Sequence, residues 1–239
     1  MTNYHVVSLS GGKDSTAMLL MMVERGMRVD EIMFADTGMD FPEMEKHIEK
    51  VEEVVGIPIT RIKHPRGFEY LMFDHLISKG KREGERGYGW ARPNARWCTS
   101  KLKTELIAKH FSDLRKTRNV IQYVGIAADE TRRCRDERYP LVEWGVTEAD
   151  ALRYCYEKGF DWGGLYGMFN RVSCWCCPLQ SLSELRTLRK NFPDLWARLL
   201  EMDARSFNTF RIDCSAEQLE QRFAYEDKQL VINLEWRSE

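Results

Sequence analysis

The chain has 239 residues, 43% of them hydrophobic and 31% charged, which is the composition of a soluble globular protein with one sizeable core and an appended lobe. Its formal net charge is -1 because 36 basic and 37 acidic residues almost balance, so no overall field draws it to nucleic acid or an anionic membrane. No apolar run approaches the roughly 20 residues of a membrane helix, and the N-terminus carries no leader pattern, so we expect a cytoplasmic protein without a membrane partner.

Residues 4–126 alternate between apolar runs of strand character and periodic runs of helix character. The predicted strands cover residues 4–9, 29–35, 57–62 and 119–126. The predicted helices cover residues 16–23, 42–55, 68–77 and 99–111. Strands that alternate with helices favour an α/β fold with a doubly wound, mostly parallel sheet covered on both faces.

The later part of the chain is mainly helical. Residues 147–150 resemble a capped helix start in front of residues 151–157. Helical periodicity returns over residues 182–189, 195–202 and 216–223. We therefore expect a nucleotide-binding α/β domain at residues 1–145. Residues 146–239 would form a cysteine-containing segment and a helical C-terminal lobe.

A glycine-rich turn joins the first predicted strand to the first predicted helix at residues 8–15, which read Ser-Leu-Ser-Gly-Gly-Lys-Asp-Ser. Such a turn directs several backbone N–H groups to one point, where the positive end of the helix also lies. It predicts a phosphate site formed by Ser8, Ser10, Gly11, Gly12, Lys13, Asp14 and Ser15. Lys13 would neutralise phosphate, Asp14 would cap the helix or orient Mg²⁺, and with Ser15 they form the predicted catalytic set. The alternative is a plain glycine turn.

The spacing of this turn excludes the ordinary mononucleotide loop, which needs four residues between its first glycine and a Gly-Lys-Ser/Thr end. Residues 10–15 instead resemble the pyrophosphate loop of the ATP pyrophosphatase superfamily, the adenine nucleotide alpha hydrolases. The resemblance implies that ATP and Mg²⁺ bind here. It also implies that ATP is cleaved between its alpha and beta phosphates, which adenylates a substrate.

Further motifs resemble one branch of that superfamily. Residues 34–38, Phe-Ala-Asp-Thr-Gly, look like the segment that meets the adenosine through Ala35, Asp36 and Thr37, although a strand end with an Asx-type turn is the alternative. Residues 96–103 and 125–132 are similar to the phosphoadenosine phosphosulfate reductase branch, and closer still to the sulfur-transfer subunit of the DNA phosphorothioation system. The resemblance covers residues 4–180 and implies that Gly125 and Arg132 border the adenosine.

The choice of chemistry within this branch depends on a cysteine motif. Sulfonucleotide reductases carry a nucleophilic cysteine in a C-terminal Glu-Cys-Gly-Ile/Leu-His motif, and the only late cysteine here, Cys214, lacks the following glycine and histidine. We therefore favour ATP-dependent sulfur transfer, with a sulfur-donor protein and a tRNA, DNA or small-molecule acceptor as partners. A sulfonucleotide reductase, and a nucleic-acid-binding or regulatory module without turnover, remain the alternatives.

Three of the seven cysteines cluster in the segment 174–177, Cys-Trp-Cys-Cys, a spacing that can hold a metal ion or a cluster. The predicted ligands are Cys155, Cys174, Cys176 and Cys177, with Cys98 as a further candidate. A similar segment in the phosphorothioation subunit implies a four-iron four-sulfur cluster. The chain departs from that pattern because residues 178–183 contain no cysteine, so structural Zn²⁺ and free thiols stay open.

Two basic segments and an aromatic group complete the sequence-based expectations. Residues 79–96 predict a mobile surface loop that either closes over ATP or stacks bases through Tyr88 and Trp90. The run 132–138 would contact phosphates or form solvated surface. We expect three aromatic residues to pack beneath the cysteine segment rather than hold a ligand. They are Trp162, Tyr166 and Phe169.

Overall fold

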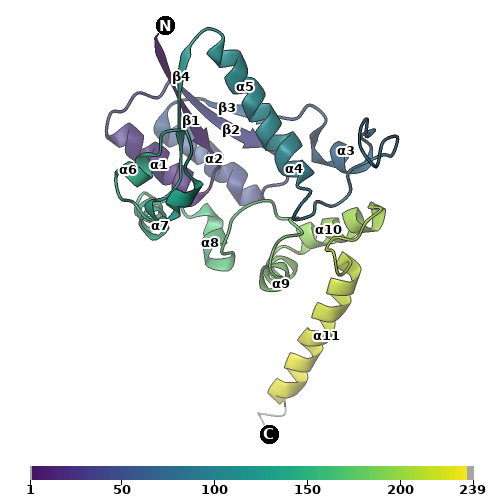
Figure 1. Cartoon of the computed structure of the whole chain (residues 1–239). Helices are drawn as coiled ribbons and strands as arrows, with labels where there is room; N and C mark the ends of the chain where they lie inside the picture. The colour runs from purple at the N-terminus through teal and green to yellow at the C-terminus, as the bar shows by residue number, and fades with distance from the viewer. Residues whose placement is uncertain (1, 236–239) are drawn as a thin grey trace. The chain divides into compact units, whose positions relative to one another are not determined.

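The computed structural model describes the chain from residue 2 to residue 235 (Figure 1). Its strands are β1 (Asn3–Leu9), β2 (Glu31–Asp36), β3 (Ile59–Lys63) and β4 (Asn119–Val124). Its helices are α1 (Lys13–Glu24), α2 (Pro42–Val55), α3 (Gly67–Phe73), α4 (Trp97–Thr99), α5 (Glu105–Arg115), α6 (Pro140–Glu143), α7 (Glu148–Glu157), α8 (Leu165–Met168), α9 (Leu182–Asn191), α10 (Pro193–Arg205) and α11 (Ala216–Glu235). A π-helical turn η1 (Ser100–Thr104) and the 3₁₀ turns η2 (Ala128–Arg133) and η3 (Trp162–Gly164) complete the set.

The four strands form one parallel sheet in the order β3-β2-β1-β4. Strands β2 and β3 lie on one side of β1, and β4 lies on its other side. The connections therefore change direction between β1 and β4. In open α/β sheets, ligands bind at such a switch point, beyond the carboxyl ends of the strands.

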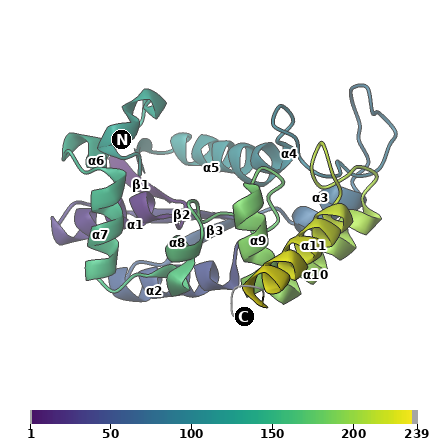
Figure 2. The same cartoon turned by 90° about the horizontal axis from the view of Figure 1, so that it is seen from below.

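Helices cover both faces of this sheet, as the sequence predicts. On one face, Phe111 of α5 is buried against Val6 of β1 and Met33 of β2. Figure 2 shows α5 and α2 on opposite sides of the strands. The predicted α/β fold with a parallel sheet and a helical C-terminal segment is confirmed.

Two predicted helices differ in detail. The helix expected at 68–77 ends at Phe73, because the backbone of residues 75–77 bonds instead to residues 84–87. The helix expected at 99–111 begins as α4, passes through the π-helical turn η1 and continues as α5. The predicted cap at 147–150 is present, because Thr147 and Asp150 exchange side-chain and backbone hydrogen bonds in front of α7.

The chain divides into two compact units. Among the described residues, the first contains residues 2–67 and 98–174, and the second contains residues 68–97 with residues 175–235. The predicted boundary between residues 145 and 146 lies inside the first unit, where α7 packs along α1. The parallel sheet and its covering helices all belong to this first unit.

The second unit joins the segment 79–96 to the C-terminal helices. The Trp90 ring is only 2% exposed, and its indole N–H donates to Asp203 Oδ1 at 2.8 Å. The backbone N–H of Trp90 donates to Asn208 Oδ1 at 2.8 Å, and Arg92 donates to the Phe210 carbonyl at 3.1 Å. The alternative in which Trp90 stacks bases is therefore wrong, because its ring is buried and its indole N–H is bonded to Asp203 within the second unit.

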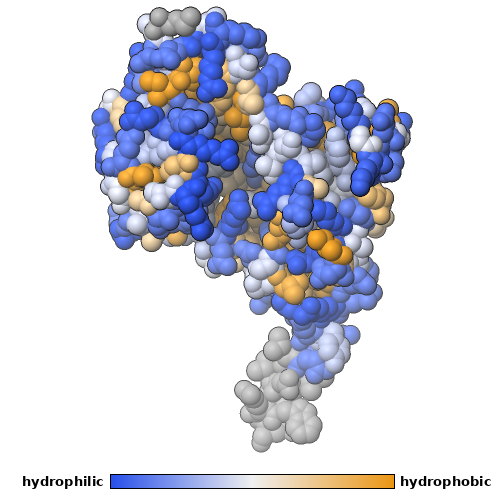
Figure 3. Space-filling view, viewed as in Figure 1, coloured by the Kyte–Doolittle hydropathy of each residue, from blue (hydrophilic) through white to orange (hydrophobic). Residues whose placement is uncertain are grey.

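No helix among the described residues is long and apolar enough to cross a membrane. The face drawn in Figure 3 is mainly hydrophilic, with separate hydrophobic areas between the polar side chains.

Candidate functional site

The turn after β1 is folded around the Ser15 side chain. Gly11 adopts a φ of 78°, in the left-handed region that glycine tolerates without strain. Ser15 Oγ donates to the Gly12 carbonyl at 3.0 Å and accepts from the Ser10 N–H at 3.1 Å. The hydroxyls of Ser10 and Ser15 lie 2.9 Å apart. This phosphate-loop candidate, residues 10–15, therefore has a fixed shape at the N-terminus of α1.

Lys13 meets two carboxylates beside this loop. Its Nζ lies 2.6 Å from Glu148 Oε2 and 3.2 Å from Asp14 Oδ2. Burial works against the charge of Lys13, but the hydrogen bonds to Glu148 and Asp14 outweigh it and raise the pKa of the ammonium. Lys13 is therefore a cation over the whole neutral range. The sequence does not reveal this contact of Glu148, although the residue lies within the predicted cap at residues 147–150.

Burial disfavours the ionised form of the Asp14 carboxyl. Burial raises its pKa, and the neighbouring Lys13 charge only partly offsets this effect. Within the described part of the chain, the buried Oδ1 of Asp14 has no hydrogen-bond partner. A buried carboxylate oxygen without a partner costs free energy, so this atom is a ready acceptor for a cation or a donor.

Gly125, directly after β4, touches the same loop from the neighbouring strand. A Cβ atom built on Gly125 would lie 2.5 Å from Ser15 Cα and 2.7 Å from Ser15 N. Real Cβ atoms do not approach backbone so closely, so only glycine allows β4 to meet the start of α1 here. The structure thus brings Gly125 to residues 10–15, across the switch point of the sheet.

The end of β2 forms a tight turn through the predicted adenosine segment. Asp36 accepts from the Gly38 N–H at 2.7 Å and from Lys63 Nζ at 3.0 Å. Thr37 is 3% exposed and its hydroxyl donates to Asp40 Oδ2 at 3.0 Å. The Asx-type turn weighed from the sequence is therefore present, and both side chains have partners within the first unit.

Two aromatic residues that we expected beneath the cysteine segment contact the phosphate loop instead. The indole N–H of Trp162 donates to the Gly11 carbonyl at 2.8 Å. The Tyr166 hydroxyl accepts from the backbone N–H of Lys13 at 2.9 Å. That expectation is wrong for Trp162 and Tyr166, because the turn η3 and helix α8 bring them to the loop.

Comparison with known proteins fits this arrangement of strand, loop and helix. Residues 4–180 match the family model described as the phosphoadenosine phosphosulfate reductase domain. The chain belongs to this reductase-domain family. The family predicted from the motifs is thereby confirmed, whereas the likeness to the phosphorothioation subunit stays a prediction.

Individual relatives of this reductase-domain protein are distant. An uncharacterized protein of Methanocaldococcus jannaschii is 26% identical over 215 residues, which cover 81% of this chain and 40% of the relative. An uncharacterized nin region protein of Escherichia phage lambda is 24% identical over 175 residues, 66% of this chain and 60% of the relative. The chain thus spans less than two thirds of the length of either curated relative.

A solved structure shares the fold. The phosphate complex of phosphoadenylyl-sulfate reductase from Candida auris superposes with a TM-score of 0.51 at 15% sequence identity. The match covers 73% of this chain and 82% of that chain. At this identity the likeness supports the α/β architecture and carries no further assignment.

The four predicted metal ligands of this reductase-domain protein have different surroundings. Cys155 is fully buried and its Sγ donates to the Lys13 carbonyl at 3.5 Å; burial raises the pKa of this thiol to about 12. Cys174 Sγ lies 3.6 Å from Thr37 Oγ1 in the first unit, whereas Cys176 and Cys177 belong to the second unit. Among residues 2–235, no three or more His, Cys, Asp or Glu side chains converge as a metal site.

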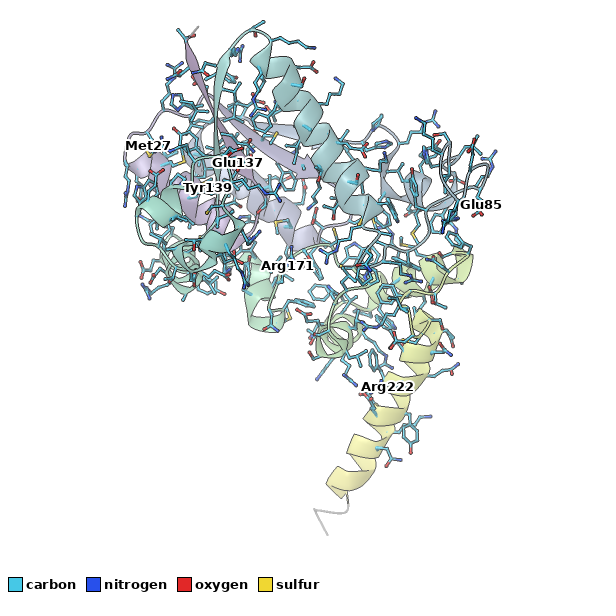
Figure 4. The ribbon with its side chains drawn as sticks, in the orientation of Figure 1. Met27, Glu85, Glu137, Tyr139, Arg171 and Arg222 are labelled. Atoms are coloured by element: carbon cyan, nitrogen blue, oxygen red, sulfur yellow. The ribbon has the colours of Figure 1, made fainter. Side chains whose placement is uncertain are left out.

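The basic run 132–138 is partly neutralised by its own neighbours. Arg133 pairs with Glu130, and Arg138 pairs with Glu143 at 2.8 Å. The Tyr139 hydroxyl donates to Glu137, and Figure 4 shows these two labelled side chains close together beside β4. Arg132, the predicted border of the adenosine, is exposed at the end of η2.

His47 supplies a pH-dependent contribution to stability. Burial, helped by the Lys50 charge, lowers the pKa of His47 from 6.5 to about 3, so the folded protein keeps the ring neutral. The unfolded chain binds a proton below its ordinary pKa, so this stabilisation is complete above it and is lost as the pH falls. At about pH 5 the loss reaches about 2 kcal/mol.

We expect His47→Gln to remove that pH dependence. Glutamine keeps a hydrogen-bonding group towards Thr16, whose hydroxyl lies 2.9 Å from His47 Nε2, and it does not titrate. Urea unfolding at about pH 8 and about pH 5 should show a free energy loss smaller by about 2 kcal/mol in the variant. Equal losses in the two proteins would contradict the assignment.

Proposed function

We propose that residues 10–15 bind the phosphates of ATP and that the protein cleaves ATP between the alpha and beta phosphates to adenylate a substrate for sulfur transfer. The observation that carries this proposal is the convergence at the switch point of the sheet. The Ser10 and Ser15 hydroxyls, the charged Lys13 and the N-terminus of α1 meet where β1 and β4 end. Such a place favours a multiply charged anion.

Lys13 and the loop would act by position and charge rather than by covalent chemistry. In the described state, Lys13 is held by Glu148 at 2.6 Å, and a phosphate oxygen is a competing partner for the same ammonium. Negative charge that develops on the departing pyrophosphate would be met by Lys13 and by the backbone amides of the loop. The Ser10 and Ser15 hydroxyls would orient the same oxygens.

The acidic side chains beside Lys13 fit a Mg²⁺ ion. Mg²⁺ in nucleotide sites is usually held by one or two carboxylates together with substrate phosphates. Asp14 offers a buried oxygen without a partner in the described part of the chain, and Glu148 contacts the same ammonium. A bound Mg²⁺ would neutralise phosphate charge, and Asp14 is the residue that we propose holds it.

The remaining predicted residues would border the rest of the nucleotide. We assign Ala35, Asp36 and Thr37 to the adenosine, with Gly125 at the loop and Arg132 nearby. Asp36 and Thr37 lie at the carboxyl end of β2, next to β1 in the sheet. The acceptor would be a tRNA, a DNA or a small molecule, and a partner protein would supply sulfur.

A sulfonucleotide reductase is the second candidate, and membership of the reductase-domain family favours it. That reaction needs a thiolate that attacks the sulfur of the bound sulfonucleotide. Cys214 is poorly suited, because burial and the neighbouring Asp213 raise the pKa of its thiol. We therefore retain ATP as the substrate and treat adenylyl sulfate as its competitor.

The products separate these candidates. Incubation with Mg²⁺ and ATP labelled in the alpha phosphate should give labelled AMP or an adenylate together with pyrophosphate. Formation of ADP and phosphate would contradict the proposed position of cleavage. Release of sulfite from adenylyl sulfate in the presence of a dithiol, with ATP left intact, would establish the reductase instead.

The cysteine segment supports a separate proposal, a four-iron four-sulfur cluster or Zn²⁺ held through Cys174, Cys176 and Cys177. Leaving Cys155 out of the ligand set is supported by the burial of its thiol and its hydrogen bond to the Lys13 carbonyl. We expect protein purified without oxygen to contain iron and sulfide or stoichiometric zinc, and to lose the metal in Cys177→Ser but keep it in Cys155→Ser. Equal loss of metal in both variants would show that Cys155 is a ligand. Unsubstituted protein that contains neither iron nor zinc would contradict the proposed metal site.

A further inference from the structure

The turn η3 has an unusual backbone. Trp162, Gly163 and Gly164 have φ values of 52°, 60° and 81°, and Trp162 is the one non-glycine residue with positive φ between residues 2 and 235. The left-handed region is disfavoured for a bulky side chain, so the surrounding structure must hold Trp162 there. A Cβ atom on Gly163 would lie 2.8 Å from Glu43 Cγ, which shows how closely the turn meets α2.

Buried contacts hold the Trp162 side chain in this conformation. The ring is 2% exposed and stacks on His47 with ring centroids 4.5 Å apart and planes 23° apart. His47 in turn lies 2.9 Å from the Thr16 hydroxyl in α1. The ring thus connects α2 and η3 to the helix that begins at the phosphate loop. The indole N–H of the same ring donates to the Gly11 carbonyl at 2.8 Å.

That hydrogen bond fixes the direction of a peptide group in the loop. The bond between Gly11 and Gly12 is trans, so its C=O and N–H point in opposite directions. With the carbonyl held by Trp162, the Gly12 N–H must point to the other side, where Ser10 Oγ lies 3.4 Å away. A flipped peptide would instead present a carbonyl oxygen there and repel an anion.

The flip is a real alternative for this sequence, because the glycines on either side remove the steric barrier that a side chain would provide. The Trp162 indole N–H donates to the Gly11 carbonyl at 2.8 Å and so favours one of the two orientations of this peptide group. The left-handed turn η3 therefore does more than pack against α2, because it also brings the Trp162 indole N–H to the Gly11 carbonyl.

We propose that Trp162 is a positioning residue for phosphate binding. Its indole N–H holds the Gly11 carbonyl away from the anion, so that the Gly12 amide faces it. The inference rests on the proposed function of residues 10–15 as a phosphate loop. Trp162 itself does not touch the nucleotide in this account, and its effect is transmitted through one peptide group.

The test uses the whole chain labelled with ¹⁵N-glycine and titrated with inorganic pyrophosphate and Mg²⁺. Gly12→Ala identifies the Gly12 signal, since the added methyl would meet nothing closer than the Tyr166 hydroxyl at 3.4 Å. In the unsubstituted protein, the Gly12 signal should shift on titration. In Trp162→Phe, which keeps an aromatic ring but loses the N–H, we expect about tenfold weaker binding and loss of the Gly12 shift.

Trp196→Phe is the matched control. Trp196 is likewise buried, at 4% exposed, and its indole N–H has an acceptor, the Glu220 carboxylate at 2.6 Å, but it belongs to the second unit. Its replacement removes the same groups and should leave pyrophosphate binding unchanged. If Trp162→Phe fails to fold, an isosteric benzothiophene in place of the indole keeps the ring and removes only the N–H.

The outcomes separate the two proposals. Unchanged affinity and an unchanged Gly12 shift in the Trp162 variants would overturn the positioning role and leave the phosphate loop standing. Equal weakening in Trp162→Phe and Trp196→Phe would reduce the effect to general stability and also overturn it. Absence of any pyrophosphate binding by the unsubstituted protein would overturn the proposed function, and the positioning role with it.

Discussion

Pyrophosphate release from ATP is expected to fall by at least about 10²-fold when Lys13 is replaced by alanine, because the loop then loses the charge that faces the departing pyrophosphate. In the structure, the Lys13 ammonium lies between Asp14 and Glu148 at 3.2 and 2.6 Å. Without it, the two carboxylates remain together and repel the nucleotide as well as each other. Release is measured with a coupled pyrophosphate assay.

Lys109→Ala is the control for this substitution. Lys109 lies in the same unit, and its side chain is 79% exposed in a pair with Asp113 one helical turn away. Exposed pairs of this kind contribute little to stability, so turnover should be unaffected. Undiminished turnover in Lys13→Ala, with both variants showing native circular dichroism, would remove Lys13 from the mechanism.

Gly125→Ala should destabilise the protein and abolish nucleotide binding together. The new methyl group would need space now filled by Ser15 Cα and N, at 2.5 and 2.7 Å. Both atoms are backbone, so relief requires β4 or the start of α1 to move. Overpacking of this kind costs about 1–3 kcal/mol, and the movement falls on the phosphate loop itself. Thermal unfolding and ATP calorimetry measure the two effects.

Gly167→Ala provides the comparison in the same unit. Apart from its chain neighbours and the backbone of its own helix α8, no heavy atom of the described chain lies within 4 Å of a Cβ built at Gly167, and its φ is not in the left-handed region. The added methyl should therefore be tolerated or slightly stabilising. A Gly125→Ala protein that melts like Gly167→Ala and still binds ATP would show that the close approach of β4 to the loop is not required.

Much of the fold could be predicted because its signals are local. The runs that form β1 and β2 are largely apolar and are followed by turn residues, and the cap at Thr147 is a pattern of four adjacent residues. The loop at residues 10–15 is equally local, since the glycines, the lysine and the serines lie within six positions. The proximity of Gly125 to this loop follows from a parallel sheet, whose strand ends share one edge.

The missed residues depend on contacts between distant parts of the chain. Trp162 and Tyr166 lie about 150 positions from the loop that they contact, and no periodicity reveals which surface an aromatic side chain will meet. The contact of Glu148 with Lys13 also joins distant parts of the chain, and helix periodicity does not predict it. The error for Trp90 has the opposite direction. The basic, glycine-rich sequence around it predicts an exposed ring, but the ring is buried.

A crystal structure determined with ATP or pyrophosphate and Mg²⁺ tests the central claim most directly. We expect phosphate oxygens within hydrogen-bonding distance of Lys13 Nζ, the Ser10 and Ser15 hydroxyls and the Gly12 amide. Phosphate density elsewhere in the molecule, with residues 10–15 unchanged and Lys13 still bound to Glu148, would contradict it.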